Sequence, residues 1–425
     1  MFLTPDGYHE SGWKLGDHDP AQSATVEGFA RTTALAERGL LDAVFIADRP
    51  VLPVFRAEFF PQVWYDPIVV LTALGMTSRR IGLIGTATTT YNAPYDLARR
   101  LSTADHATAG RIGWNVVTTH DRDAARNFGL ADHPEHDDRY ARASEFVDVV
   151  RLLWDSWADD AIVADRDAGV WADIGRIRPA DFHGRYYDVA GALSVPRSPQ
   201  GHPVLAQAGS SPAGVALAGR IADLVFTPQQ SAEAALAFRE RIEGVATEHG
   251  RRPDEIRILP GLAFELGRTE ADATERRRQL EELADPGLRW RNLAYNAGLD
   301  PNRIDPERPL DPEVGATAEQ TTFGQFIVGR ALETQLPFGQ LAQTLTGLPG
   351  GLEFTGTPEQ LADLICDWVL TGACDGFTLQ PATVPHALEL FVDDVVPILQ
   401  RRGLHRHAYT GSTLRDHLGL ARPGL

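Results

Sequence analysis

Short apolar runs alternate along the chain with longer stretches of helical periodicity. The runs are continuously apolar, which is typical of strands covered on both faces, as in a parallel sheet. They span residues 41–48, 80–88, 111–118, 203–209, 222–227, 256–266 and 375–381. With the fragment 2–4 at the start of the chain, the pattern predicts eight strands.

Between these runs, apolar residues recur at helical spacing. In residues 137–157 a single stripe contains Tyr140, Ala143, Val147, Val150, Trp154 and Trp157. Further helices are predicted at 25–38, 94–107, 231–249 and 358–370. Eight strands, each followed by a helix, predict an α/β fold of the (β/α)8 TIM-barrel type, and a doubly wound open sheet is the alternative.

Two long insertions and a C-terminal arm are predicted within a single domain, 1–425. Residues 159–202 precede the fifth strand and contain "FHGRYYDVAGALSVPRSPQG", which predicts a short hairpin beside an irregular loop. Residues 285–355 precede the eighth strand and carry weak helical pieces such as "FGQFIVGRALETQL". Loops of this length are usually functional lids or linkers.

The C-terminal arm, 400–425, carries several apolar side chains in an acidic chain: Leu404, Tyr409, Leu414 and Leu418. Exposed apolar surface of this kind is typical of a contact between subunits. We therefore expect the arm to pack against a neighbouring copy, in a homodimer or homotetramer.

Polar residues follow several predicted strands, at the end where a parallel barrel holds its active site. Asp48, Thr88 and Asn115 occupy such positions, although Asp48 could instead cap a helix. In "AGSSPAG", Ser210 and Ser211 follow a strand and precede a proline that suits the first turn of a helix. Free backbone N–H groups there favour a phosphate, and a plain serine cap is the alternative.

His136 and Tyr140 lie four residues apart, on one face of a helix. Together they could donate to a phosphate or position a ring, and a surface histidine beside a packed tyrosine is the alternative. No strand ends in a pair of metal-ligating histidines, so we expect no metal site.

Composition excludes some partners. Acidic residues number 58 against 40 basic ones, a formal charge of −18, and no basic stripe is visible. Neither nucleic acid nor an anionic membrane is therefore expected as a partner. Cys366 and Cys374 match no zinc or redox spacing, and the N-terminus lacks the features of a signal peptide, which predicts a cytoplasmic protein.

The stretch "GRIGWNVVTT", with "HDDRYARASEFVDVVRLLWDSW" behind it, resembles the nitrilotriacetate and pristinamycin IIA monooxygenase group of the bacterial luciferase-like superfamily. Further matches include "GLLDAVFIAD", "PQGHPVLAQAGSSPAGVALAGRIADLVFT" and "GTPEQLADLICDWVLTGACDGFTL", so the likeness covers nearly the whole chain. It implies a TIM-barrel monooxygenase that takes reduced FMN (FMNH2) from a separate NAD(P)H:FMN reductase. With O2 as co-substrate, such an enzyme oxygenates a small organic substrate through a C4a-peroxyflavin.

The resemblance also implies roles for individual residues. Asp48 and Thr88 would lie by the flavin ring or ribityl chain, with Asn115 nearby. The ribityl and phosphate end would be held by His136, Tyr140, Ser210 and Ser211. One departure is "GWKLGD", where Lys14 replaces the arginine of the family's "WRHP" and puts the substrate class in doubt.

His9, on the loop after the first strand, is the candidate catalytic residue, as an acid or hydrogen-bond donor to substrate or peroxide. A solvent-facing loop histidine is the alternative. Three other functions stay open: a deazaflavin (F420)-dependent oxidoreductase of the same superfamily, a non-catalytic flavin-binding protein, and a metal-dependent hydrolase.

Overall fold

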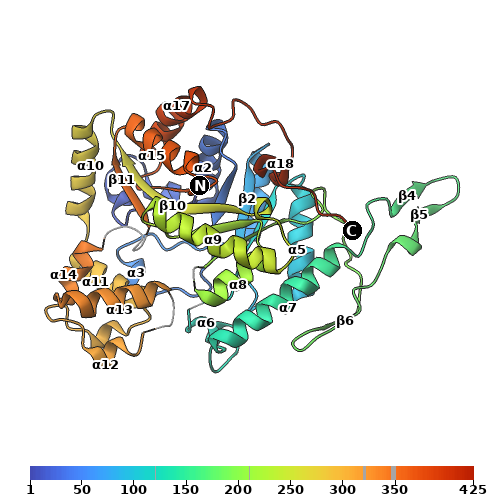
Figure 1. Cartoon of the computed structure of the whole chain (residues 1–425), viewed down its shortest axis with the longest axis horizontal. Coiled ribbons are helices and arrows are strands. Elements are labelled where there is room, and N and C mark those ends of the chain that lie inside the picture. The colour runs from blue at the N-terminus through green and yellow to red at the C-terminus, as the bar shows by residue number, and fades with distance from the viewer. Residues whose placement is uncertain (120, 210, 319–321, 346–350) are drawn as a thin grey trace.

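The computed structural model describes residues 1–425 except 120, 210, 319–321 and 346–350. Its centre is a parallel sheet in which consecutive strands are neighbours (Figure 1). The strands are β1 (Ala43–Ile46), β2 (Gly82–Thr88), β3 (Ile112–Val117), β8 (Val204–Ala208), β9 (Leu224–Thr227), β10 (Arg257–Leu266) and β12 (Thr378–Pro381). Each matches a predicted run.

The N-terminal segment joins the two edges of this sheet. Phe2 forms a parallel bridge with Phe45 of β1, and the Phe2 N–H donates to the carbonyl oxygen of Leu379 in β12 at 2.8 Å. The first predicted strand is therefore a single ladder residue that lies between β1 and β12. The predicted (β/α)8 barrel is confirmed.

Helices surround the barrel (Figure 1). Those between successive strands are α2 (Val26–Arg38), α4 (Pro67–Thr77), α5 (Pro94–Ala107), α7 (His136–Trp154), α8 (Pro212–Ile221), α9 (Ala232–Glu248), α10 (Glu270–Leu283) and α15 (Pro358–Leu370). Shorter pieces are η1 (Gly12–Lys14), α1 (Pro20–Ser23), α3 (Val54–Ala57), α6 (Ala124–Asn127), η3 (Pro253–Glu255), α16 (His386–Leu390), η5 (Phe391–Val395) and α17 (Val396–Arg401). The predicted stripe of α7 is buried at Ala143, Val147, Val150 and Trp154, but Trp157 lies beyond the end of the helix.

The C-terminal arm closes the amino end of the barrel. Its last helix, α18 (Leu414–Leu418), places Leu414 in the apolar cluster that fills the barrel interior with Phe45 and Phe226. A Cβ on Gly82 would lie 2.3 Å from Leu414, so this strand needs glycine there. For Leu414 the prediction that it packs against a neighbouring copy is wrong, because this side chain is fully buried within its own chain. Leu404 and Leu418 are partly buried against the apolar clusters of their own chain, and whether a neighbouring copy also contacts the arm stays a prediction.

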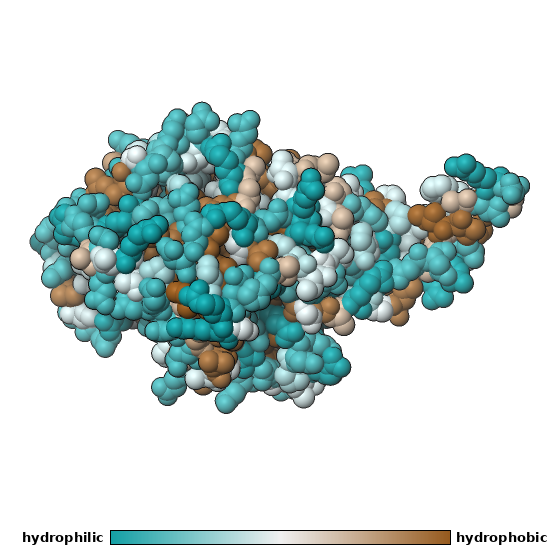
Figure 2. Space-filling model, turned by 90° about the horizontal axis from the view of Figure 1, so that it is seen from above, coloured by the Kyte–Doolittle hydropathy of each residue, from teal (hydrophilic) through white to brown (hydrophobic). Residues whose placement is uncertain are grey.

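The first insertion projects from the body (Figure 1). It holds the predicted hairpin, β6 (Phe182–His183) with β7 (Asp188–Val189), and a second hairpin that the sequence did not reveal, β4 (Ile162–Asp165) with β5 (Val170–Ala172). The turn η2 (Ile174–Arg176) follows β5. Figure 2 shows apolar side chains gathered on the projecting part.

The second insertion has a small apolar core of its own, built around Leu293, Ile327 and Phe338. Its elements are α11 (Pro286–Asn296), η4 (Pro301–Arg303), α12 (Pro312–Gly315), α13 (Thr322–Thr334), α14 (Phe338–Thr344) and β11 (Leu352–Gly356). α13 confirms the helical piece predicted there, and β11 pairs in parallel with the carboxyl half of β10. None of the helices in the described residues combines the length and apolarity that a membrane crossing needs.

Candidate active site

Polar side chains of neighbouring strands meet at the carboxyl end of the barrel. Thr86 of β2 is in register with Asn115 of β3, and Asn115 Nδ2 donates to Thr86 Oγ1 at 3.0 Å. Thr119 Oγ1 donates to Thr88 Oγ1 at 2.7 Å. Asn115 is buried and its Oδ1 has no hydrogen-bond partner among the described residues. The strand ends therefore hold an acceptor that is free for a ligand.

Asp48 follows β1 at the same end of the barrel. Burial raises the pKa of its carboxyl to about 6, and the negative charge of Asp66 adds to the effect. Asp48 does not cap a neighbouring helix, because α3 begins after Pro53 and α4 after Asp66. This carboxyl can therefore exchange a proton close to neutral pH.

The helices α7 and α8 begin at this same end, and they pack side by side through Arg220, which donates to the Ser144 carbonyl oxygen at 2.7 Å. The rings of His136 and Tyr140, in the first turns of α7, lie 4.9 Å apart. Ser211 caps α8, where its Oγ accepts the Gly214 N–H at 3.1 Å and keeps its own proton to donate. Two helix N-termini with hydroxyl and imidazole groups favour an anion.

Ser210, the remaining residue of the predicted phosphate site, lies outside the described residues.

His9 is buried rather than solvent-facing, so the alternative of an exposed loop histidine is wrong. Its Nδ1 accepts the Ser11 N–H at 3.2 Å, which assigns the proton to Nε2, and Nε2 lies 3.4 Å from Glu281 Oε1. In the described part of the chain, no hydrogen bond links His9 to Asp48, Thr88 or Asn115. The structure thus brings the strand-end residues together and places His9 on a separate wall.

That wall belongs to an apolar cavity of about 70 Å³ between the N-terminal segment and β1. Aromatic side chains dominate its lining, which includes Phe2, Trp13, Phe29, Phe60 and Trp64. Ile46, at the end of β1, also lines the cavity, so the cavity lies beside the carboxyl end of this strand. An apolar pocket beside a few fixed polar groups is typical of a small-molecule site.

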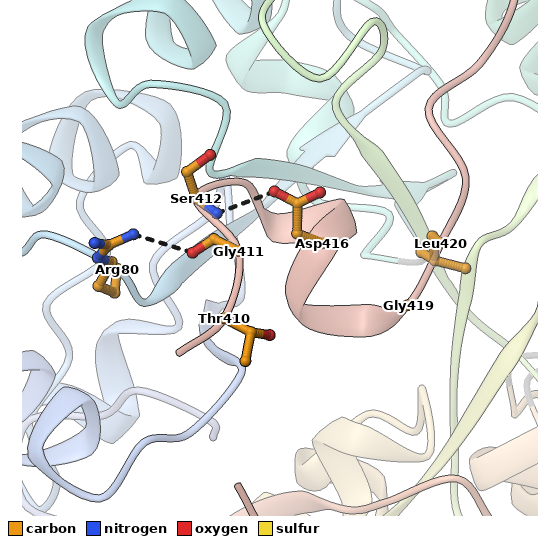
Figure 3. Close-up of a pocket in the computed structure, with 7 residues that line it drawn as sticks. All are labelled: Arg80, Thr410, Gly411, Ser412, Asp416, Gly419 and Leu420. Atoms are coloured by element: carbon orange, nitrogen blue, oxygen red, sulfur yellow. Dashed lines mark hydrogen bonds between the residues drawn. The ribbon is translucent and has the colours of Figure 1, made fainter. Parts of the chain in front are cut away.

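A wider hollow of about 660 Å³ lies at the opposite, amino end of the barrel (Figure 3). It is formed by the C-terminal arm against Arg80, which donates to the Gly411 carbonyl oxygen at 3.1 Å. The Ser412 N–H donates to Asp416 Oδ2 at 3.0 Å. The polar groups that line this hollow hold the C-terminal arm against the barrel. The active sites of such barrels lie at the opposite, carboxyl end of the strands, so this hollow is not the candidate active site.

The second insertion covers the mouth of the site. Tyr295 of α11 donates its hydroxyl proton to Asp121 Oδ2 at 2.6 Å, just beyond β3. Its ring also lies over the guanidinium of Arg49, 5.6 Å from the ring centroid. Sequence reasoning missed all three residues. Arg49 and Asp121 carried a signal, since they follow predicted strands, but nothing in the sequence placed Tyr295 there.

A charged network fastens the N-terminal loop to this insertion. Arg289 of α11 pairs with Glu10 and with Glu281. Lys14 Nζ donates to the Leu283 carbonyl oxygen at 2.9 Å, at the end of α10. Lys14, the departure from the family pattern, therefore helps to hold the second insertion over the site. The described residues contain no cluster of three or more His, Cys, Asp or Glu side chains that could hold a metal ion.

Comparison with known proteins agrees with this arrangement. The Luciferase-like monooxygenase family model matches residues 11–374. The N-acetyl-S-(2-succino)cysteine monooxygenase of Bacillus subtilis (strain 168) is 39% identical over 100% of this chain and 96% of its own. Nitrilotriacetate monooxygenase component A of Aminobacter aminovorans is also 39% identical, over 98% of this chain and 95% of its own.

Among solved structures, a riboflavin lyase with modified FMN and its substrate riboflavin superimposes with a TM-score of 0.89 at 30% identity. That match covers 100% of this chain and 96% of the lyase. The full-length likeness and the shared barrel lead to one assignment: the chain belongs to the luciferase-like monooxygenase family.

Proposed function

We propose that this protein is the oxygenase of a two-component system, which receives reduced FMN from a separate NAD(P)H:FMN reductase and uses O2 to oxygenate a small organic substrate. The observation that carries the proposal is the full-length, 39% identity to two monooxygenases, one of them named a component A. It favours this function over F420-dependent hydride transfer and over a protein that binds flavin without catalysis.

The residues present fit FMN. The unpaired Asn115 Oδ1 suits a flavin N–H or ribityl hydroxyl, and Thr88 and Asp48 offer further polar groups on adjacent strands. His136, Tyr140 and Ser211 suit the phosphate, because two helix N-termini favour a dianion. Reduced FMN, when bound, supplies the chemistry with O2.

The chain itself orients the substrate and excludes water. The hydrogen bond between Tyr295 and Asp121 holds the insertion over the strand ends, which limits the access of solvent. His9 carries a proton on Nε2, which the carboxylate of Glu281 orients. Because the neutral imidazole has only this one proton, His9 can donate it to a substrate only in place of Glu281. We propose that an acceptor atom of the substrate replaces Glu281 at the edge of the apolar cavity.

We also propose that the protein forms a homodimer or a homotetramer, on different grounds from those in the sequence. The helix α4 is apolar on all sides, and Val69 and Met76 on its outer face are 69% and 72% exposed. A helix of this kind normally has a partner on every face. On the projecting insertion, Trp171 of β5 and Ile174 of the following turn η2 are 68% and 84% exposed.

The test is incorporation of oxygen from isotopically labelled O2 into a product, with chemically reduced FMN and a substrate panel that includes nitrilotriacetate and N-acetyl-S-(2-succino)cysteine. We expect labelled product with reduced FMN alone, or with FMN, NADH and an added reductase. NADH-driven turnover by this chain without a reductase would contradict the two-component assignment, since the sequence has no dinucleotide-binding glycine fingerprint. Label in no product of the panel would count against the oxygenase.

A further inference from the structure

Two arginines stand unpaired beside the apolar cavity. Arg49 follows β1 at the carboxyl end of the barrel, and Arg56 lies on α3 in the same loop. Within the described residues, neither side chain makes an ion pair or a hydrogen bond. Arg49 Nη1 and Arg56 Nε are nevertheless buried from solvent. Burying guanidinium nitrogens without hydrogen-bond partners lowers the stability of the fold. Such nitrogens therefore indicate a site where a ligand supplies the missing acceptors.

Ring faces hold both guanidinium groups in place. Arg49 lies over Trp64 at 5.5 Å and Tyr295 at 5.6 Å, and Arg56 lies over Phe60 at 5.6 Å. Contacts with ring faces position a guanidinium and use none of its five N–H donors. The donors of both arginines therefore remain available, already oriented, for an acceptor.

The absence of partners is local and not a shortage of acids, since the chain carries a formal charge of −18. Arg276, Arg277 and Arg289, which lie around the same mouth, each pair with carboxylates. The nearby acids are engaged elsewhere, because Asp121 accepts from Tyr295 and Glu10 pairs with Arg289. No described carboxylate forms an ion pair with Arg49 or Arg56, and the charge of Glu10 reaches Arg56 only from a distance.

The two cations also act on one another. Burial first, and then the positive charge of Arg49, lower the pKa of Arg56 to about 10, although Tyr295 and Glu10 act in the opposite direction. Like charges held close together repel, so the pair gains from an anion placed between them. A carboxylate fits a guanidinium in a bidentate manner, and two guanidinium groups suit a ligand with two carboxylates.

Phe60 and Trp64, the rings under these arginines, also line the apolar cavity. A ligand whose carboxylates reach the arginines would extend its apolar part into this cavity, beside the strand end that carries Asp48. We propose that Arg49 and Arg56 form the carboxylate subsite of the substrate pocket, and that the substrate is a small aliphatic di- or polycarboxylate. This inference rests on the proposed function, whose substrate class it names.

The test measures the binding of succinate, and of its neutral isostere succinamide, to the full-length, flavin-free protein by calorimetry. The variants are Arg49→Gln and Arg56→Gln. The matched control is Arg241→Gln, which removes an arginine that lies over the Phe238 ring at 5.5 Å on α9, among the helices outside the barrel. Circular dichroism and FMN affinity check the fold of each variant.

We expect the parent to bind succinate well and succinamide weakly, and each pocket variant to lose roughly ten- to a hundredfold in succinate affinity. The control should bind succinate like the parent. Equal affinity of the parent for succinate and succinamide would overturn the inference, and so would unchanged succinate binding in both pocket variants. Failure of the proposed function is distinguishable from failure of this inference. If the protein is not an FMN-dependent oxygenase, FMN binding and oxygen incorporation will be absent whether or not succinate binds.

Discussion

At the scale of single residues, the phosphate end of the candidate flavin site rests on hydroxyl groups that the sequence already indicated. Tyr140→Phe and Ser211→Ala each remove one hydroxyl and keep the rest of the side chain. If these groups donate to a phosphate dianion, each change should weaken FMN binding by roughly ten- to a hundredfold. Fluorescence titration with FMN measures the effect.

Riboflavin, which lacks the phosphate, is the control for these two variants. Its affinity should be weak for the parent and unchanged by either substitution. Equal loss of riboflavin and FMN affinity would mean that Ser211 serves only as the cap of α8, a role that its bond with the Gly214 N–H already provides.

The buried carboxyl of Asp105 predicts how the stability of the fold depends on pH. It is fully buried, and its Oδ1 accepts the Ile112 N–H at 2.9 Å and Gln200 Nε2 at 2.8 Å. Burial raises the pKa of this carboxyl from 3.8 to about 6. The folded state therefore keeps a proton that the unfolded state has lost, so Asp105 lowers the stability progressively as pH rises from about 4 to about 6.

Asp105→Asn removes this titration and keeps the Oδ1 acceptor. Relative to the parent, the free energy of unfolding of the variant should rise by up to about 3 kcal/mol between about pH 4 and about pH 7. Urea denaturation at the two pH values measures it. A difference between variant and parent that does not change with pH would exclude Asp105 as the titrating group.

The sequence predicted part of the site for a physical reason. Asp48 comes just after β1, Thr88 ends β2 and Asn115 lies in the carboxyl half of β3, and the carboxyl ends of such parallel strands must meet. Their role toward flavin stays a prediction. Tyr295 reaches the same place from an insertion with its own apolar core, whose position against the barrel depends on contacts such as Arg289 with Glu10. Periodicity contains no information about contacts of this kind.

At the scale of elements, α4 and α18 show where periodicity does and does not predict structure. α4 was not among the predicted helices, because it is apolar on all sides and shows no stripe. α18 was part of an arm assigned to a subunit contact, whereas Leu414 fills the barrel interior. An apolar arm looks the same in sequence whether it covers its own barrel or a neighbour.

Leu414 is therefore a structural residue of the barrel. Leu414→Ala should lower the free energy of unfolding by about 2–5 kcal/mol, because it leaves a cavity between α18 and the strands β2 and β3. Leu370→Ala, at a position on α15 that is 73% exposed, is the matched control and should change stability by about 0.5 kcal/mol or less. Equal, small effects of the two changes on urea denaturation would contradict the role of Leu414.

At the scale of the whole molecule, the number and order of barrel strands were predictable because each strand is buried on both faces. The oligomeric assembly was not predictable from the sequence, because it depends on surfaces that exist only once the chain has folded. Among the described residues, two groups of exposed apolar side chains are candidates for subunit contacts: Val69 and Met76 on the outer face of α4, and Trp171 with Ile174 on β5 and the following turn η2. A symmetric dimer needs one self-complementary surface, and a tetramer of dihedral symmetry needs two.

The existence of two surfaces favours the tetramer, and paired substitutions test it. Val69→Glu with Met76→Glu should remove the α4 contact, and Trp171→Ser with Ile174→Ser should remove the contact of the projecting insertion, because each replaces apolar contact area with polar groups. Sedimentation should then show a dimer for each pair and a monomer for the four changes together. Leu370→Glu, a single exposed apolar position outside both surfaces, should leave the assembly unchanged. A parent protein that sediments as a monomer at micromolar concentration would contradict the proposed assembly. If the parent is a dimer and one pair of substitutions alone makes it a monomer, the subunit contact is confined to the surface that carries that pair.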